Sequence, residues 1–530
     1  MKHLLLTSAM LLTMSVQLTH AAVHYVKAGA TGDGTSWATA SGSIDDMLEK
    51  AVPGDEIWIA TGTYKPVKLI NSSKKNSRAF TLKEGVSLYG GFAGTETSKA
   101  DRTFAASGKA YDFEHETILS GDDDVPDVWE RALMYASNYR YGWRVEKDLI
   151  PGTANNSNHI LYSNVKFEKA TVINGFTLKG GNAMVWKVKA AGGALYAKGN
   201  VHLAACKVLE NSAYFTVQST GSSDTQGGAV RLEGSGTASI EDCYFARNFS
   251  HSSFGNGLGG AVYAINVTIA RCEFEHCVAL DAGGALVNVG GTVSQCRFSD
   301  CYAFTGGAVY NQGTMTDSHI FDCRGIHGGG LFNNVKAERV VVAGCHADTE
   351  DYGATEGGKG GGIYNQGGEV FGAVVYNNLA FKGGGIFVRG GRITSCTVQH
   401  NAGRNTNVDA DLGYFDGSSE ADNVVNTIAG TVGDTNFHNP TSFYGVASND
   451  TQKAAIRTAS WALVAGSSLA GKGYEAYTTG IAAPSMAGEV VSTTYYTLDG
   501  MVTQPVHGGV YIKRDRLSNG HVITKKLVIK

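Results

Sequence analysis

The chain has little proline, no large excess of one charge and no Cys-x-x-Cys pair, and each of these absences excludes some classes of protein. Proline accounts for 7 of 530 residues, whereas 70 are glycine and 10% are aromatic, which excludes collagen-like and proline-rich disordered chains. A net charge of −4 provides no electrostatic attraction for nucleic acid. Without a Cys-x-x-Cys pair, the commonest zinc and redox signatures are missing. The composition therefore indicates a folded, glycine-rich chain.

The N-terminus has the pattern of a secretory signal. Lys2 and His3 precede a short apolar stretch, and the small residues Ala21 and Ala22 offer a cleavage site. This stretch is shorter than the about 20 apolar residues that a membrane span needs, and no later segment is long enough either. We therefore expect residues 1–21 to be removed and the mature chain to be exported, extracellular or on the outer cell surface, without a transmembrane span.

A four-residue motif, Gly-Gly-(Ala/Gly)-(Leu/Val/Ile), recurs through the middle of the chain. Its eight copies begin at Gly192, Gly227, Gly259, Gly283, Gly306, Gly328, Gly360 and Gly383. The intervals are 35, 32, 24, 23, 22, 32 and 23 residues, so a unit of 22–24 residues recurs, with insertions in three copies. Self-similarity at a fixed period is the sequence signature of a solenoid.

Four columns align when the repeats are placed under one another. The first column is Leu203, Ile240, Ile269, Val293, Met315, Ala337, Val370 and Ile393. Three residues later come Cys206, Cys243, Cys272, Cys296, Ser318, Val340, Ala373 and Cys396. Two residues later come Val208, Phe245, Phe274, Phe298, Ile320, Val342, Val375 and Val398. A further three residues later come Asn211, Asn248, Cys277, Cys301, Cys323, Cys345, Asn378 and Asn401. A spacing of two places residues on one face of a strand, and spacings of three indicate bends, so each unit predicts one coil of a parallel β-helix.

Stacked coils would bring identical positions over one another, about 4.8 Å apart. We expect the aliphatic and phenylalanine columns to form a dry interior, and the asparagine column to hydrogen-bond its amides along the stack. All nine cysteines lie between Cys206 and Cys396. Parallel Cβ directions disfavour disulfides between neighbouring coils, so mostly free, buried thiols are predicted.

A column of mostly aromatic residues follows the glycine motif. It contains Tyr196, Arg231, Tyr263, Val287, Tyr310, Phe332, Tyr364 and Phe387. Alternation along the strand predicts that these side chains point outward. Two interpretations remain open here, a structural aromatic stack and a strip on which sugars stack.

The sequence between residues 23 and 121 lacks the glycine motif and predicts strands and one helix. Strand-like runs lie at 56–60, 85–91 and 117–120. An amphipathic helix precedes them, with Ser43 as its cap and Pro53-Gly54 as its stop. Its apolar face is predicted to contain Ile44, Met47, Leu48, Ala51 and Val52. A solenoid needs its first open edge covered, so this helix is a candidate cap.

The insertions fall at one phase of the coil, after the asparagine and cysteine corner. They occupy residues 212–226, 249–258 and 346–359, and a fourth is predicted at 183–191, leading into the first repeat. Insertions at one phase project from one edge of a solenoid, and that edge is often the binding surface.

A long aperiodic stretch, residues 122–158, interrupts the pattern before the repeats begin. It starts with Asp122–Asp124 and then interleaves aromatic rings with cations. The candidate binding residues are Trp129, Tyr135, Tyr139, Arg140, Tyr141, Trp143 and Arg144. Such interleaving suits a loop that binds sugar or protein, and a surface loop packed on itself is the alternative.

The repeats, GGA-(L/V/I)-Y with C-x-F-x-x-(N/C), resemble those of right-handed parallel β-helix proteins of the pectin-lyase-like superfamily. They are especially similar to the GGA(I/L/V) and FxxN repeats of polymorphic outer-membrane proteins. YVKAGATGDGTSW at 25–37 and PGDEIWIATGTY at 53–64 resemble the first coils of exported β-helix proteins from the Bacteroidetes group, and WALVAGSSLAG at 461–471 resembles their closing coil. The resemblance implies an all-β fold, a single-stranded right-handed parallel β-helix over residues 22–473 with regular repeats at about 192–401.

The tail carries a second resemblance. YYTLDGM at 495–501, GGVYIKR at 508–514 and KKLVIK at 525–530 resemble the C-terminal sorting module of cargo exported across the outer membrane in that bacterial group. This implies a small β-rich module at 491–530 after a linker at 474–490, and outer-membrane secretion machinery as a partner. Asp499-Gly500 independently predicts a hairpin. A β-rich accessory domain is the alternative.

Catalytic polysaccharide lyases and hydrolases need clustered carboxylates with a Ca²⁺ and a base, or an acid/base pair. No column of the repeats provides such a set, so the catalytic residues stay unassigned, and no cofactor or metal is predicted. If the chain is an enzyme, Ca²⁺ could be its cofactor, with Asp122–Asp124 or Asp409 and Asp411 as candidate ligands. Solvated loop carboxylates are the alternative interpretation of these residues. The sequence favours an adhesin-like surface protein that binds a glycan or a surface protein of another cell or matrix. The alternative is a secreted polysaccharide lyase or glycoside hydrolase.

Overall fold

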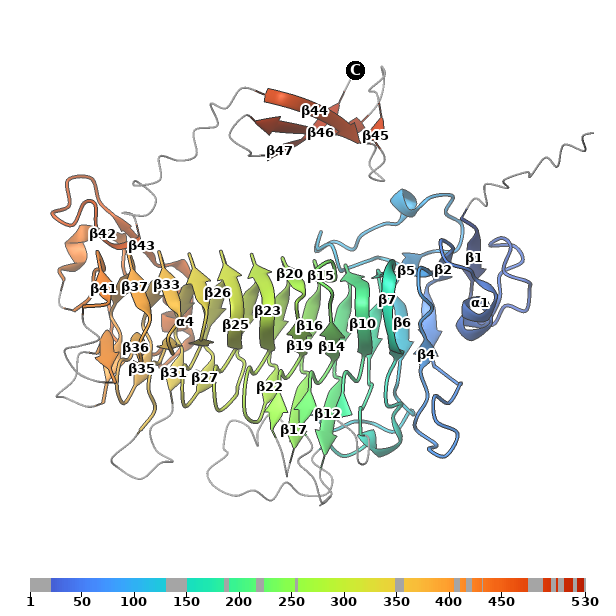
Figure 1. Cartoon of the computed structure of the whole chain (residues 1–530), viewed down its shortest axis with the longest axis horizontal. Helices are drawn as coiled ribbons and strands as arrows, with labels where there is room; N and C mark the ends of the chain where they lie inside the picture. The colour runs from blue at the N-terminus through green and yellow to red at the C-terminus, as the bar shows by residue number, and fades with distance from the viewer. Residues whose placement is uncertain are drawn as a thin grey trace, which may run out of the picture.

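The protein is described by a computed structural model whose core is an elongated stack of parallel coils (Figure 1). The described residues are 21–129, 150–184, 190–215, 224–252, 256–347, 357–404, 410–415, 422–430, 432–474, 490–496, 502–503, 510–517 and 522–528. The predicted secretory signal lies almost wholly outside them. In the described chain, successive coils pair through parallel strands, which makes the fold a parallel β-helix.

Sheet A forms the longest wall of the stack, and its twenty described strands pair in parallel. They are β1 (Val23–Val26), β2 (Glu56–Ala60), β4 (Phe80–Thr81), β5 (Ser87–Phe92), β7 (Leu161–Asn174), β10 (Leu195–Ala204), β14 (Val230–Glu233), β15 (Ser239–Glu241), β19 (Val262–Ile265), β20 (Thr268–Ala270), β23 (Leu286–Ser294), β25 (Val309–Thr316), β28 (Leu331–Asn333), β29 (Lys336–Glu338), β32 (Ile363–Asn365), β33 (Glu369–Phe371), β36 (Ile386–Val388), β37 (Arg392–Thr394), β40 (Leu412–Tyr414) and β41 (Val424–Val425). The three predicted N-terminal strands are confirmed within one or two residues, two of them in this sheet as β2 and β5.

Sheet B is the second wall, with eleven strands among the described residues. They are β3 (Gly62–Tyr64), β6 (Thr117–Ser120), β8 (Thr177–Lys179), β11 (Lys207–Leu209), β16 (Tyr244–Ala246), β21 (Glu273–Glu275), β24 (Arg297–Ser299), β26 (His319–Phe321), β30 (Val341–Ala343), β34 (Val374–Tyr376) and β38 (Thr397–Gln399). Most are three residues long, so each strand turns one side chain inward and two outward.

Short strands continue the coils along the edge where the insertions were predicted. One group is β12 (Ser212–Phe215), β17 (Phe249–Ser252) and β22 (Val278–Ala279), and a second is β9 (Ala190–Ala191), β13 (Thr225–Gln226) and β18 (Gly257–Leu258). Farther along lie β27 (Arg324–Gly325), β31 (His346–Ala347), β35 (Leu379–Ala380) and β39 (Ala402–Gly403). The described parts of the insertions therefore lengthen the coil instead of forming separate loops.

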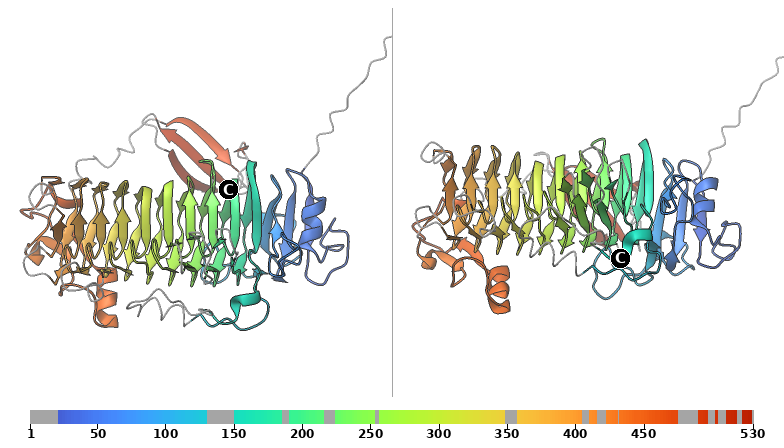
Figure 2. Two further views of the ribbon diagram at one scale, coloured as in Figure 1. Left: turned by 60° about the horizontal axis from the view of Figure 1, so that its bottom comes forward. Right: turned by 90° about the horizontal axis from the view of Figure 1, so that it is seen from below.

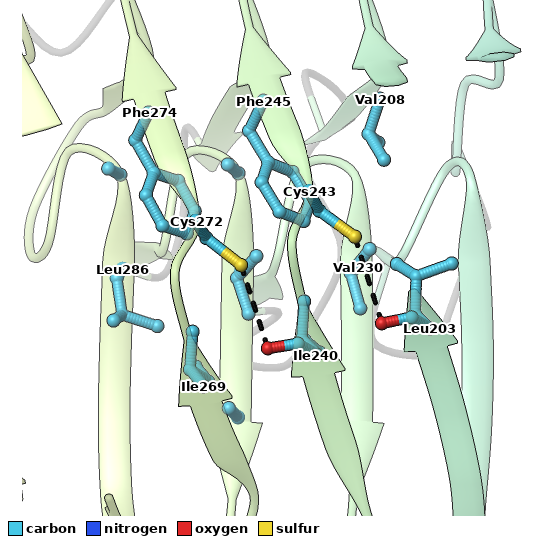
Figure 3. Close-up of a cluster of buried hydrophobic side chains, with 14 of the residues drawn as sticks. Leu203, Val208, Val230, Ile240, Cys243, Phe245, Ile269, Cys272, Phe274 and Leu286 are labelled. Carbon is cyan, nitrogen blue, oxygen red and sulfur yellow. Dashed lines mark hydrogen bonds between the residues drawn. The ribbon is translucent and has the colours of Figure 1, made fainter. Parts of the chain in front are cut away.

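The predicted interior columns are confirmed residue by residue. Phe245 pairs with Phe274, and Phe274 with Phe298, in the registers of neighbouring sheet B strands. Their rings are stacked with centroids 4.7 Å apart and interplanar angles of 6° and 7°. Figure 3 shows two of these rings facing the aliphatic side chains of sheet A, among them Ile240 and Ile269. The period thus fixes which side chains meet in the core.

The cysteine side chains line the interior as predicted, and all nine are buried with free thiols. The Cys243 thiol donates to the carbonyl oxygen of Leu203 at 3.7 Å, and the Cys272 thiol to that of Ile240 at 3.5 Å (Figure 3). Burial raises the pKa of Cys272 well above its usual value, so this thiol stays protonated.

Each coil turns sharply just before the cysteine column and again just before the asparagine column, where the spacings of three predicted bends, but the alignment does not reveal the conformation of these corners. In the central coils the residue at each turn has a positive φ, for example 54° at Asp242, 55° at Arg271 and 50° at His276. Only a minority of non-glycine residues adopt this left-handed conformation. The turns place polar side chains of successive coils in two files, one on each side of sheet B.

Asparagine ladders run inside the stack. In the predicted one, Asn378 donates from its amide to Asn401 at 2.9 Å, and Asp411 ends it by accepting from Asn401 at 2.8 Å. A second ladder, which the sequence analysis missed, lies at the bend of sheet A and contains Asn288, Asn311, Asn333 and Asn365, joined at 2.9, 2.9 and 2.8 Å. Every ladder member is buried, so these bonds satisfy amides that water does not reach.

The predicted helix is α1 (Ile44–Lys50), at the N-terminal end of the stack (Figure 1). Ser43 caps it by accepting from the backbone of Asp46 at 3.1 Å. Ile44, Met47 and Leu48 are buried in the main core, as predicted. Val52 is an exception, because the helix ends at Lys50 and leaves Val52 55% exposed in the following turn.

Among the described residues, the other helical elements are α4 (Asp450–Thr458), the orange helix in Figure 2, and the short turns η1 (Lys99–Asp101), η2 (Thr153–Asn155) and η3 (Asp434–Asn436). Beside α4, β42 (Phe437–Asn439) and β43 (Ser460–Leu463) form an antiparallel pair near the C-terminal end of the stack (Figure 1). No helix among the described residues is long and apolar enough to cross a membrane.

The C-terminal residues form a separate antiparallel sheet in the order β45-β44-β46-β47. Its strands are β44 (Val490–Tyr496), β45 (Val502–Thr503), β46 (Val510–Leu517) and β47 (Val522–Val528). Tyr496 pairs with Val502 in an antiparallel register, so β44 and β45 form a hairpin, as predicted. Asp499 and Gly500 themselves lie outside the described residues. The sorting role and the boundaries at 474 and 490 stay predictions.

Candidate functional site

Of the seven candidate binding residues in the aromatic and basic stretch, the structure describes only Trp129. Tyr135, Tyr139, Arg140, Tyr141, Trp143 and Arg144 lie outside the described residues. Trp129 is only 4% exposed and packs with Ile150, Tyr214 and Phe249 beside the short edge strands. Its ring is therefore in contact with protein and is not open to a sugar.

The aromatic column of sheet A lies outside the main core, as the alternation predicted. Phe332 stacks on Tyr310 and on Tyr364 with ring centroids 5.1 and 4.8 Å apart, and Tyr364 lies 5.1 Å from Phe387. Phe387 is 1% exposed, and Phe332 and Tyr364 are also buried. In these coils the rings cover one another, so the structure favours the structural stack over the sugar-binding strip.

The outer face of sheet B has a different character, because two segments from the ends of the chain cover its two ends. Residues 99–116, the N-terminal cover, lie over the first coils. Lys207 on β11 pairs with Asp112 at 3.1 Å and with Glu116 at 2.7 Å. Farther along, the Tyr111 ring stacks on Tyr244 of β16 with centroids 5.5 Å apart.

Residues 432–474, the C-terminal cover, lie over the last coils. Trp461 and Ile456 of this segment form one buried cluster with Phe321 and Tyr376 of sheet B. The hydroxyl of Tyr376 donates to the Ile456 carbonyl oxygen at 2.7 Å. The cover is thus anchored by both apolar packing and a buried hydrogen bond.

Between the two covers, the outward side chains of β21, β24 and the start of β26 are exposed or half-buried, apart from the small Ser299. We call this surface the open strip and define it by Glu273, Glu275, His276, Arg297, Asp300 and His319. Lys109 of the N-terminal cover pairs with Glu273 at one border. At the other border Arg457 of the C-terminal cover pairs with Asp322 at 2.9 Å.

The closest group on the open strip joins two successive coils. One ligand-type atom each from Glu275, His276 and Asp300 lies within 4.8 Å of the others. The nearest Glu275 and His276 atoms, Oε1 and Nε2, are 3.9 Å apart. The other oxygen of Glu275 accepts a hydrogen bond from the Tyr244 hydroxyl at 2.7 Å. The group therefore combines two carboxylates with an imidazole, the side chains that serve as acids, bases and metal ligands.

Burial and the neighbouring Asp322 carboxylate raise the pKa of Asp300, while His276, Lys453 and Arg457 oppose the shift. The hydrogen bond to Glu275 and burial also raise the pKa of Tyr244 far above its usual value, so the phenol remains a donor. A carboxyl group with a raised pKa beside an exposed imidazole is a combination that occurs at functional sites.

The sequence analysis missed this group because its members belong to different coils. His276 and Asp300 occupy equivalent corner positions 24 residues apart, one repeat period. Reading the outward columns beside the interior ones would have brought them together. The described calcium candidates have protein partners instead: Asp122 accepts from the backbone of Asp124 at 2.7 Å, Asp124 pairs with Lys65 at 2.5 Å, and Asp411 ends the asparagine ladder. Asp409 lies outside the described residues.

Two solved structures are similar to the chain over most of its length. One is described as a crystal structure of pectate lyase Pel9A, with a TM-score of 0.31, 11% sequence identity, and coverage of 86% of this chain and 92% of that one. The other is a rhamnogalacturonan lyase, with a TM-score of 0.30, 12% identity, and coverage of 86% and 100%. No protein-family model and no curated protein matches the chain.

Proposed function

We propose that the chain is an exported, adhesin-like β-helix protein that binds a glycan with the open strip of sheet B. The observation that carries this proposal is the contrast between the strip and its surroundings. Both ends of the sheet B face are covered by the chain itself, whereas Arg297 and His319 between them point into solvent. A surface left open between two covers, rich in hydrogen-bond donors and acceptors, suits a polar polymer.

Retention of the purified protein in gels that contain acidic or neutral polysaccharide tests this proposal. We expect at least one polysaccharide to retard the wild-type chain, and the Arg297→Ala/His319→Ala double variant to lose most of that retardation. Gln312→Ala is the matched control, since Gln312 is exposed on sheet A. Equal retardation of the double variant and the control would contradict the assignment of the surface.

The second candidate is a polysaccharide lyase or glycoside hydrolase, and one observation favours it. Glu275, His276 and Asp300 lie within 4.8 Å of one another, so an acid and a base are within reach of one bond of a bound polymer. Incubation with acidic and neutral polysaccharides, with and without Ca²⁺, distinguishes the two functions. New unsaturated or reducing ends that disappear in His276→Gln would establish the enzyme, and binding without cleavage would support the adhesin-like function.

The proposal also covers the hand of the coil, the capping of its first edge and the route of export. We infer that the coil is single-stranded and right-handed, because parallel strands joined in one sheet cross over with this hand in about 98% of cases. We assign the capping role to α1, whose buried face covers the first coil. The signal at residues 1–21 and the C-terminal module at 491–530 would direct export to the cell surface through outer-membrane secretion machinery. There, a glycan or surface protein of another cell or matrix is the expected partner.

A further inference from the structure

The group Glu275, His276 and Asp300 has the dimensions of a site for one cation. Its ligand-type atoms lie within 4.8 Å of one another, and Glu275 Oε1 is 3.9 Å from His276 Nε2. Ligands at about 2.0–2.2 Å from a tetrahedral zinc ion are about 3.4 Å apart. The three side chains therefore need to approach one another by only about an ångström, which rotation of the exposed His276 ring and a small adjustment of the two half-buried carboxylates provide.

Two of the three ligands are already held in place. The Tyr244 hydroxyl binds Glu275 Oε2 at 2.7 Å and so turns Oε1 toward His276. His276 occupies a coil corner with a φ of 50°, which fixes where its side chain leaves the backbone. Hydrogen-bonded neighbours of this kind orient the ligands in known metal sites.

Asp300 supplies the independent observation. Its carboxylate is half-buried, and no group of the described chain donates a hydrogen bond to it. The nearby Asp322 carboxylate repels it, and Arg457 is engaged with Asp322 at 2.9 Å. His276, Lys453 and Arg457 attract Asp300 but only partly offset its burial and this repulsion, and a bound cation would provide the remaining compensation.

We propose that Glu275, His276 and Asp300 bind one divalent transition-metal ion of the zinc class, with at least one coordination position open. The imidazole nitrogen of His276 indicates the class of ion, because Ca²⁺ and Mg²⁺ take oxygen ligands whereas Zn²⁺ accepts nitrogen and carboxylate oxygen together. Three protein ligands leave a fourth position of a tetrahedral ion for water or for a group of a bound molecule. The inference is independent of glycan binding, because the ion binds the chain alone.

Calorimetric titration of the full-length chain with ZnCl₂, without glycan, tests this site. We expect one ion to bind per chain, and His276→Gln and Asp300→Asn each to weaken its affinity at least tenfold. Tyr244→Phe, which removes only the support of Glu275, is expected to weaken it about tenfold. His438→Gln is the matched control, since His438 is exposed on β42, away from the strip. Substitution with Co²⁺ would report the nitrogen and oxygen ligand set through its visible absorption.

The titrations distinguish a zinc site from no site and from a calcium site. Unchanged zinc affinity in both His276→Gln and Asp300→Asn, or no one-to-one binding by the wild type, would overturn the proposal. Ca²⁺ affinity equal to that for Zn²⁺ would overturn the assigned class of ion. Melting curves of each metal-free variant check its folding, and the mild Tyr244→Phe change keeps the proposal testable if a ligand variant does not fold. Zinc binding without polysaccharide retention would leave this inference standing and remove only the proposed function.

Discussion

The covered and open parts of the sheet B face occupy equivalent strands of successive repeats, yet their outward side chains have opposite chemistry. Under the C-terminal cover the outward positions are apolar, for example Val341, Val374 and Tyr376. In the open strip the positions in register with Val341 and Val374 are Glu273 and Arg297, and the position in register with Tyr376 is Glu275. The inward positions do not change in character. The residue types in the outward columns thus depend on what lies over each coil, whereas those in the inward columns depend only on packing inside the coil.

The largest effect should come from the inward side of the open strip. Phe274→Ala removes a fully buried ring between two stacked neighbours, and we expect it to lower the free energy of unfolding by about 3–5 kcal/mol. Arg297→Ala, one coil away on the outer face, should change it by less than about 0.5 kcal/mol. Urea unfolding of both variants measures the contrast. Similar losses for the two variants would contradict the inside and outside assignment.

The second prediction concerns the contact that attaches the C-terminal cover to sheet B. Ile456 is fully buried between the cover and sheet B, so Ile456→Ala should cost about 2–5 kcal/mol of local stability. Hydrogen exchange should then increase throughout residues 432–474 and remain unchanged in the open strip. The nearby exposed Lys453→Ala serves as the control. Faster exchange in the strip as well would mean that the two regions are not independent.

Acid should destabilise the N-terminal coils through a buried histidine. Burial lowers the pKa of His159 to about 4 from an ordinary value of 6.5. The unfolded chain therefore binds more protons between these values, so the stabilising contribution is complete above pH 6.5 and is lost as the pH falls toward 4, by about 1.4 kcal/mol per unit.

Burial raises the pKa of Asp281 to about 6, which opposes this trend, because its contribution is lost as the pH rises through that value. The histidine effect is therefore measured as the difference between the wild type and His159→Gln at pH 4–7. The stability of the wild type should fall more steeply with acid than that of His159→Gln. Parallel curves for the two proteins would show that His159 is not buried in the neutral form.

The smallest of these effects should come from the asparagine ladder that lies behind the sheet A bend. Asn333 accepts from Asn311 at 2.9 Å and donates to Asn365 at 2.8 Å. Asn333→Ala leaves buried amide groups without partners, and we expect a loss of about 1–3 kcal/mol in urea unfolding. The exposed Gln312→Ala in the preceding coil should have almost no effect. A neutral Asn333→Ala would show that the ladder does not contribute to stability.

The interior of the coil stack could be predicted from the sequence because stacking repeats the same environment at each period. Phe245, Phe274 and Phe298 recur for that reason, and the structure confirms them. The surface proposed to bind glycan shows no such repeat, because the outward side chains differ with the segment that lies over each coil. His276 and Asp300 therefore share a column position without sharing a residue type.

Other features depended on contacts that a single sequence does not reveal. In the aromatic and basic stretch, the burial of Trp129 could not be predicted, because its ring packs against edge strands that come from later in the chain. The binding role of the other six residues stays a prediction. The apolar face of the predicted helix extended to Val52 because periodicity does not locate the exact turn at which a helix ends. The left-handed corners were also missed, because residues as different as Asp242 and Arg271 adopt them.

Carboxyl footprinting with a water-soluble carbodiimide tests the central claim most directly. The full-length chain would be labelled with and without a polysaccharide that retards it in gels, and the labelled residues identified by mass spectrometry. The account predicts that Glu273, Glu275 and Asp300 lose labelling when the polysaccharide binds, while the exposed Asp317 at the opposite corner of the coil keeps most of its labelling. Protection confined to the insertion edge, with the three strip carboxylates still labelled, would contradict the claim that the open strip is the functional surface.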